Sequence, residues 1–129
     1  MEKRRFIIGM GCERGAPVED VSELAERALR EAGVMPDELA ALASIDMKRD
    51  EPAILAVAKR LGIPARFFSA AMLERETPRL KNPSALVFAR VGCHGVAEAA
   101  ALAGAGAASE LVLPKIKSAF ATAAIAVIG

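Results

Sequence analysis

Short apolar runs alternate with segments of helical spacing in the first half of the chain. The run Arg5–Gly9 predicts a buried strand, and the sequence GMGCERG at Gly9–Gly15 predicts a glycine-rich loop. Apolar positions then recur at helical spacing from Val18 until Gly33, directly after a proline that suits a first helical turn. The next predicted elements are a short helix at 36–42, a strand at 44–47, a helix that starts at 50–52 and ends at 61, and a strand at 65–68.

The second half of the chain is less regular. Residues 70–83 predict a loop with short helices, because prolines interrupt a charged stretch, and Ser84–Val91 fits either a helix or a strand. Val96–Ala103 predicts an alanine-rich helix, and Glu110–Leu113 and Ser118–Ile128 predict final strands that suit a hairpin. The whole pattern predicts a single α/β domain over residues 1–129, built as a three-layer α/β/α sandwich with a mostly parallel or mixed sheet.

The length, charge and composition of the chain argue against several classes of function. With 129 residues the chain suits one hydrophobic core, since such cores fill with roughly 100 to 200 residues. A net charge of +1, no Trp or Tyr and only five Phe argue against nucleic acid and against an anionic membrane as partners. The apolar run at 119–128 is shorter than the about 20 residues of a membrane span. Two cysteines are too few for a disulfide framework, so we expect a cytoplasmic protein.

The glycine-rich segment is a candidate anion site. Gly11 and Gly15 would let backbone N–H groups converge on a ligand ahead of a helix, and Arg14 could add a clamp for a carboxylate or phosphate. The spacing matches neither the dinucleotide G-x-G-x-x-G fingerprint nor a Walker loop. The alternative is that these glycines only form a tight turn between a strand and a helix.

The two cysteines and the single histidine are candidates for reactivity or metal binding. Cys12 lies next to a predicted helix N-terminus, which would favour a thiolate nucleophile, although a small buried residue is the commoner role. Cys93 and His94 are weak metal-ligand candidates, because no second ligand pair lies at a suitable spacing, and so no metal site is predicted. The simpler interpretation is that His94 caps the helix that begins near Val96.

Two charged clusters lie near predicted strand ends, where open α/β sheets bind ligands. Asp46 and Glu51 could act in acid–base chemistry and are, with Cys12, the catalytic candidates, but Asp50 and Glu51 also suit helix caps. The second cluster could bind acidic groups of a ligand or simply be a solvated strand edge. It consists of Lys115 and Lys117 with Ser118 and Thr122.

Five segments in register resemble one known family. They are GMGCERG, SIDMKRDEPAIL, FFSAAML, VGCHGVAEAAAL and LPKIKSAFATAAIA, and they span nearly the whole chain. In this order and spacing they are similar to the cobalamin-biosynthesis domain family that includes stand-alone CobE and the C-terminal domain of CbiG. The stand-alone form is the more similar of the two. The resemblance implies a place in corrin ring construction, around ring contraction and lactone handling.

The resemblance implies a function as well as a pathway. We expect the protein to bind or carry a precorrin or corrinoid intermediate, to need no cofactor, and to meet other cobalamin-biosynthesis enzymes. The alternative implied by CbiG is cobalt-precorrin lactone hydrolysis with release of acetaldehyde, an activity of longer chains. A small nucleotide-binding domain is a third possibility that depends on the glycine loop alone.

The resemblance also points to particular residues. Glu13 departs from the family pattern where a second basic residue is common, and Cys93-His94 fills a loop where a small residue and proline are expected. A corrinoid carries acetate and propionate carboxylates around an apolar macrocycle, and Arg14, Lys48, Lys115 and Lys117 suit those carboxylates. The positions that match the family pattern are Gly11, Cys12, Arg14, Gly15, Asp46, Lys48, Asp50, Glu51, Glu98, Lys115 and Thr122.

Overall fold

A five-stranded mixed sheet forms the centre of the molecule. The computed structural model describes residues 4–129, and the strand order is β3-β2-β1-β5-β4. Strands β1, β2 and β3 are parallel, whereas β5 runs antiparallel to both β1 and β4. The bounds are β1 Phe6–Cys12, β2 Leu39–Ile45, β3 Ala65–Phe68, β4 Glu110–Lys117 and β5 Ala121–Val127. The predicted mixed sheet and the predicted final hairpin are confirmed.

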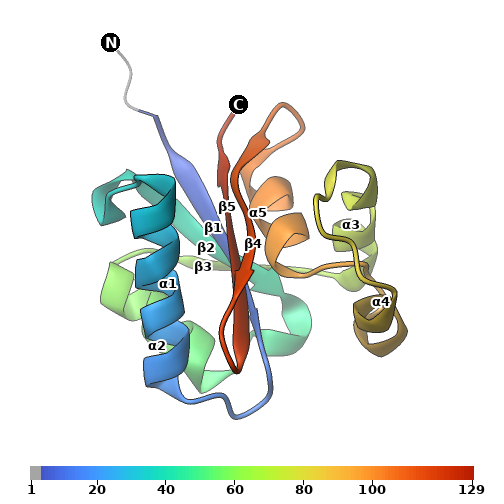
Figure 1. The fold of residues 1–129 in the computed structure, drawn as a ribbon, viewed down its shortest axis with the longest axis horizontal. Coiled ribbons are helices and arrows are strands. Elements are labelled where there is room, and N and C mark those ends of the chain that lie inside the picture. Colours follow the sequence, from blue (N-terminus) through green and yellow to red (C-terminus); the bar gives the residue numbers. More distant parts are fainter. Residues whose placement is uncertain (1–3) are drawn as a thin grey trace.

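Helices cover both faces of this sheet, as the predicted three-layer sandwich requires (Figure 1). Helices α1, Val18–Ala32, and α2, Pro52–Leu61, pack on the face that carries Ile8 and Met10 of β1. Helix α5, Ala97–Ala105, packs on the opposite face against Ile7. Alternate residues of β1 therefore enter two separate cores. Among residues 4–129, no helix is both long enough and apolar enough to cross a membrane.

The glycines of β1 allow α5 to lie unusually close to the sheet. A Cβ on Gly9 would overlap the Ala97 carbonyl oxygen and lie 2.6 Å from the Ala101 nitrogen. A Cβ on Gly11 would lie 3.2 Å from the side chains of Val96 and Thr122. The prediction of a loop over 9–15 is therefore wrong in its first four positions, which belong to β1. These two glycines serve packing between helix and sheet, which is a different role from the tight turn that the sequence pattern offered as the alternative to a ligand loop.

Two other predicted elements change in the structure. The helix predicted over 36–42 is wrong: a single 3-10 turn at Pro36–Glu38 leads directly into β2, which starts at Leu39. The reason is tertiary, because the buried run 39–45 lies between β1 and β3. Strand β4 extends four residues beyond the predicted 113, through Pro114, which an edge strand tolerates.

Residues 70–92, here called the arm, extend from the sandwich beside α5 (Figure 1). The arm contains α3, Ala70–Glu74, a 3-10 turn at Thr77–Arg79, and α4, Ala85–Val91, which resolves the open helix-or-strand alternative. Leu73 is the arm's one buried residue. Ala70, Leu80 and Val91 are only partly buried against the same core, so polar contacts also hold the arm in position.

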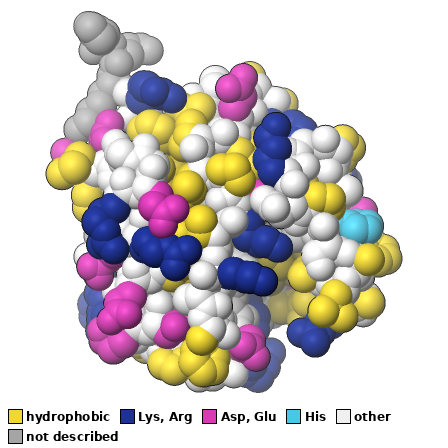
Figure 2. Space-filling model, in the orientation of Figure 1, with side chains coloured by type: hydrophobic (Ala, Val, Ile, Leu, Met, Phe, Trp, Pro, Cys, Tyr) yellow, Lys and Arg dark blue, Asp and Glu magenta, His cyan; other side chains and the backbone are white. Residues whose placement is uncertain are grey.

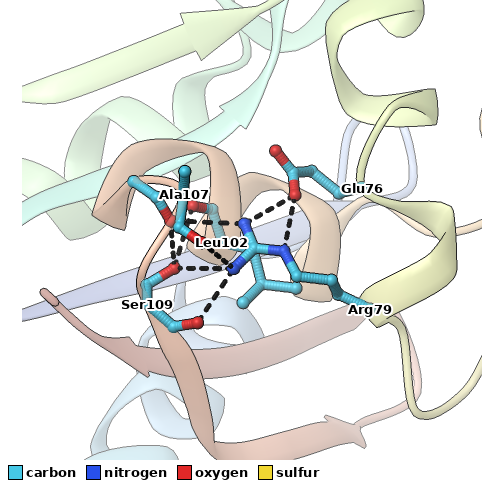
Figure 3. Close-up of polar contacts among 6 residues, drawn as sticks. Glu76, Arg79, Leu102, Ala107 and Ser109 are labelled. Carbon is cyan, nitrogen blue, oxygen red and sulfur yellow. Dashed lines mark hydrogen bonds and ion pairs between the residues drawn. The ribbon is translucent and has the colours of Figure 1, made fainter.

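One of these polar contacts is made by Arg79 (Figure 3). Its guanidinium is 2.6 Å from Glu76 Oε1 and donates to the Ser109 carbonyl at 2.8 Å and to the Gly106 carbonyl at 3.2 Å. The Gly106 carbonyl lies just beyond the C-terminus of α5, where a cation is favourable. Arg79 thus joins the arm to the segment between α5 and β4.

Candidate functional site

A pocket of about 630 Å³ lies where the carboxyl ends of β1 and β2 meet the hairpin β4–β5 and helix α4. This is the end of the sheet at which open α/β folds bind ligands. Strands β1 and β2 contribute Gly11, Cys12 and Ile45, and the turn after β2 contributes Met47 and Lys48. The remaining walls come from α4, from Gly95 and Val96, and from residues 115–122.

The pocket is strongly cationic although the whole protein is nearly neutral. Lys48, Arg90, Lys115 and Lys117 line it, against the single acidic residue Glu13. Within residues 4–129, none of these four head groups forms an ion pair. Cations gathered in a concave site and left without carboxylate partners favour an anionic ligand.

Apolar side chains form the rest of the lining. Val87 and Val91 come from α4, and Val96 lies at the start of α5. Met47 and Phe120 lie at the mouth with 47% and 41% of their surface exposed. A large apolar body with several peripheral anionic groups would match both kinds of lining.

Cys12 lies in this pocket but is poorly suited to be a nucleophile. Partial burial raises the pKa of its thiol to about 11, a rise that Lys48 opposes and that Glu51 and Glu13 increase. At neutral pH the thiol is therefore protonated. The expectation of an activated Cys12 next to a helix N-terminus is not met, because Pro17 and the turn at 13–16 separate it from α1.

The predicted ligand residues divide into two groups. Gly11, Cys12, Lys48, Lys115, Lys117 and Thr122 line the pocket together. Arg14, Gly15, Asp46, Asp50 and Glu51 do not line it. Arg14 and Asp50 are exposed on the surface, and Asp46 begins a 3-10 turn in which its carbonyl accepts a hydrogen bond from the Arg49 N–H. Their part in ligand binding stays a prediction.

Glu51 occupies the position predicted for a helix cap, but its carboxylate makes no cap hydrogen bond to α2. It is 3% exposed, and its Oε2 accepts a hydrogen bond from the Gly15 N–H at 3.1 Å. The buried carboxylate thus holds the turn that follows Cys12. This contact gives Glu51 a structural role beside the pocket.

The contacts of Cys93 and His94 are with residues of the arm and of its connection to α5. His94 Nδ1 lies 2.9 Å from both carboxylate oxygens of Glu74, and its ring stacks on Phe88 with centroids 4.4 Å apart. Cys93 is buried, with Sγ 3.8 Å from the Gly95 carbonyl. Across the described residues, no three His, Cys, Asp or Glu side chains are grouped to hold a metal ion. The prediction that His94 caps the following helix is wrong, since α5 starts without a side-chain cap.

Sequence reasoning missed Arg90 and Phe120 as lining residues. Arg90 lies on α4, a segment whose spacing left helix and strand equally open, and its approach to β4 depends on the path of the arm. Phe120 lies in the hairpin turn between β4 and β5, whereas the sequence pattern predicts it within the strand 118–128. The predicted hairpin was the one sequence feature that could have identified Phe120, because a hairpin places its turn residues beside Lys117.

Comparison with known proteins gives consistent matches over nearly the whole chain. Residues 6–126 match the family model described as cobalamin synthesis G C-terminus. Over 121 residues the chain is 57% identical to Protein CobE from Sinorhizobium sp., covering 94% of this chain and 79% of that protein. The crystal structure of CobE, a protein from the cobalamin (vitamin B12) biosynthetic pathway, superimposes with a TM-score of 0.91 at 42% identity, covering 99% and 93% of the two chains.

A longer relative shares the same region. The chain is 35% identical over 121 residues to a cobalt-precorrin-5A hydrolase from Priestia megaterium. That match covers 94% of this chain but only 32% of the hydrolase. About two thirds of the hydrolase therefore has no counterpart in the matched region.

Proposed function

Because this chain belongs to the cobalamin synthesis G C-terminus family, and thus to cobalamin biosynthesis, we propose that it binds a precorrin or corrinoid intermediate and releases it unchanged. The site is the pocket between α4 and the carboxyl ends of β1 and β2. Its ligand groups are the acetate and propionate carboxylates at the edge of the macrocycle. The apolar residues at the pocket mouth contact the ring.

The observation that carries this proposal is the set of four unpaired cations around an apolar wall. These cations come from three separate parts of the fold, namely the turn after β2 (Lys48), α4 (Arg90) and β4 (Lys115 and Lys117), so they do not all lie along one edge. A macrocycle with carboxylates around its circumference presents anions in several directions at once. Charge-assisted hydrogen bonds to such groups are among the stronger polar contacts in proteins.

Two observations favour binding over hydrolysis. The Cys12 thiol has a pKa of about 11, and Asp46 and Glu51 do not line the pocket with it. The three catalytic candidates therefore do not converge on one reacting atom. The hydrolase relative also has most of its length outside the region it shares with this chain.

The proposal is tested by absorbance titration with a metal-free corrinoid that has free carboxylates, followed by mass analysis of the recovered ligand. We expect a saturable spectral shift and an unchanged mass. Lys115→Ala should weaken binding by about tenfold, the effect of losing one charge-assisted hydrogen bond. The matched control is Lys59→Ala, because Lys59 is exposed on α2 and is absent from the pocket lining.

The same titration with the corrinoid's carboxylates converted to amides tests the recognition chemistry. We expect much weaker binding of the amide. A recovered mass that has changed would establish hydrolysis in place of carrying. Equal affinity of the Lys115→Ala and Lys59→Ala variants, or no spectral shift at high micromolar protein, would overturn the proposed site.

A further inference from the structure

Helix α4 forms one wall of the pocket, and the hydrophobic core anchors it only at Val91, its last residue. It has no buried side chain, and Leu86 and Phe88 are 63% and 44% exposed. Figure 2 shows hydrophobic side chains gathered on the surface around the chain's single histidine. Since apolar burial fixes only its last residue, the place of Arg90 in the pocket depends on what holds the start of α4.

The N-terminal side of α4 is held by a buried carboxylate. Glu98, in the first turn of α5, is 2% exposed. Its Oε1 accepts from the backbone N–H groups of Lys81 and Asn82, each at 2.9 Å. Its Oε2 accepts from the Asn82 side-chain amide at 2.8 Å and from the Lys115 backbone N–H at 2.9 Å. One side chain thus joins the arm to β4.

We propose that Glu98 is a positioning residue for the pocket, setting Arg90 of α4 and Lys115 of β4 at the spacing that the ligand's anionic groups require. The proposal rests on the proposed function for its ligand. Glu98 does not line the pocket, so it acts through the two cations and not by touching the ligand.

The path from Glu98 to Arg90 is short. Asn82 is followed by Ser84, whose Oγ accepts from the Val87 N–H at 3.2 Å and so begins α4. The Ser84 N–H also donates to the His94 carbonyl at 2.7 Å. Fixing Asn82 therefore fixes the first turn of the helix that carries Arg90.

The path from Glu98 to Lys115 is direct. The Lys115 backbone N–H is held by Glu98, on the pocket side of Pro114, in a strand whose pairing with β5 is irregular between Leu113 and Ile116. At this point the carboxylate replaces a regular ladder bond. The Glu98 carboxylate therefore fixes the backbone position of Lys115, from which its side chain extends at the edge of the sheet.

Only a carboxylate satisfies all four donors. Each of its two oxygens accepts two hydrogen bonds, whereas glutamine would keep one oxygen and turn an NH₂ group toward N–H donors. Glu98→Gln keeps the volume of the side chain while breaking either the tie to the arm or the tie to β4. It is the appropriate variant for separating position from packing.

The test is a set of double-mutant cycles on corrinoid affinity, measured by the absorbance titration. We expect Glu98→Gln to weaken binding by about tenfold. The further loss should be less than about threefold in at least one of the Arg90→Ala and Lys115→Ala backgrounds, namely the one whose tie the glutamine breaks. Lys48→Ala is the control background, because Lys48 lies on the turn after β2 and is not one of the residues that donate to Glu98, which are Lys81, Asn82 and Lys115. In the Lys48→Ala background, Glu98→Gln should still weaken corrinoid binding by the full tenfold or so. Wild-type affinity, or equal losses in all three backgrounds, would overturn the proposal.

A second measurement does not depend on the corrinoid. Hydrogen exchange should be faster in Glu98→Gln at the amides of Lys81, Asn82 or Lys115, and unchanged at Gly15, whose acceptor is Glu51. Unchanged exchange at all of them would overturn the role of Glu98. If the wild-type protein binds no corrinoid, the proposed function fails, and the exchange data still decide whether Glu98 ties the arm to β4. Should Glu98→Gln fail to fold, Asn82→Ala removes one of the four bonds from the exposed side and takes its place in both tests.

Discussion

The Gly15 backbone N–H donates a hydrogen bond to a carboxylate oxygen of Glu51, 36 positions along the chain. The contact joins the turn after β1 to the start of α2, and so joins the loops that follow two adjacent parallel strands. Glu51 is buried at this point without a cationic partner within residues 4–129. The turn between Cys12 and α1 is therefore held by a carboxylate that the sequence pattern assigned to catalysis or capping.

Glu51→Ala should lower the free energy of unfolding by about 1–3 kcal/mol, because it leaves the Gly15 N–H without its acceptor and opens a small cavity. Corrinoid affinity should change little, since Glu51 does not line the pocket. Urea unfolding and the absorbance titration measure the two effects. The control is Glu23→Ala, an exposed position on α1, which should leave both values unchanged. A variant that keeps its stability but loses ligand affinity would return Glu51 to the binding site.

Gly9→Ala and Gly11→Ala should differ in their cost. A Cβ at Gly9 meets the backbone of α5, which cannot move away without displacing the helix, so we expect a loss of about 3 kcal/mol or more. A Cβ at Gly11 meets the side chains of Thr122 and Val96 at 3.2 Å, and these can shift, so about 1 kcal/mol is expected. Thermal unfolding of the two variants compares them directly. The reverse order would show that helix α5 is not held by close backbone contact.

The Cys12 thiol should react slowly at neutral pH. Its pKa of about 11, raised chiefly by burial, leaves little thiolate below pH 9, so the rate of alkylation by iodoacetamide should rise with pH throughout the range 7–10. In the Cys93→Ala variant, Cys12 is the one thiol left to be alkylated, so the measured rate belongs to Cys12. A rate that reaches a plateau near pH 7 would indicate an activated thiolate and would favour covalent chemistry in the pocket.

Stability should fall in acid partly through Glu98. Burial alone would raise the pKa of this carboxyl, but its four hydrogen bonds outweigh that effect and hold the pKa below the ordinary value of 4.5. A pKa lowered by folding stabilises the protein above the unfolded value, and this stabilisation disappears as pH falls through the folded value. The stability difference between wild type and Glu98→Gln should therefore be largest near neutrality and shrink below about pH 4.5.

Chemical denaturation at pH 7, 5 and 4 measures this dependence. Glu74→Gln is the useful comparison, because His94 lowers the pKa of the Glu74 carboxyl and that group contributes to the same acid range from the exposed side of the arm. A constant difference between wild type and Glu98→Gln across the range would mean that folding does not lower the pKa of the Glu98 carboxyl.

The sequence pattern was sufficient where an element is determined by its own residues. Helix α1 has the predicted extent because its apolar stripe, its preceding proline and its terminal Gly33 are all local signals. The first part of strand β2, residues 39–42, was predicted as helix, because a run of Leu and Ala has no strand preference until neighbouring strands bury it. Lys115 was predicted as a ligand residue because a local signal, its place near a predicted strand, was available. Arg90 was not predicted, because its place in the pocket depends on tertiary structure.

The candidate site depends on tertiary contacts even more than the helices and strands do. Gly11 and Cys12 are predicted from the glycine-rich segment, and Lys48 and Lys115 from charged clusters near predicted strands. The parallel pairing of β1 with β2 and the place of β5 between β1 and β4 bring these regions together. No local pattern could show that Glu98 accepts bonds from both the arm and β4, because its partners lie 16 and 17 positions away on opposite sides. Contacts of that kind depend on the completed fold.

The position of β5 between β1 and β4 also has a consequence for the order of assembly during synthesis. β5 is the last strand along the chain, yet it occupies an interior place in the sheet. Until the ribosome has delivered it, β1 lacks one of its two neighbours and the hairpin with β4 cannot form. A chain synthesised only as far as β4 therefore exposes one edge of β1 and the part of α5 that packs on β5, a state in which aggregation competes with folding.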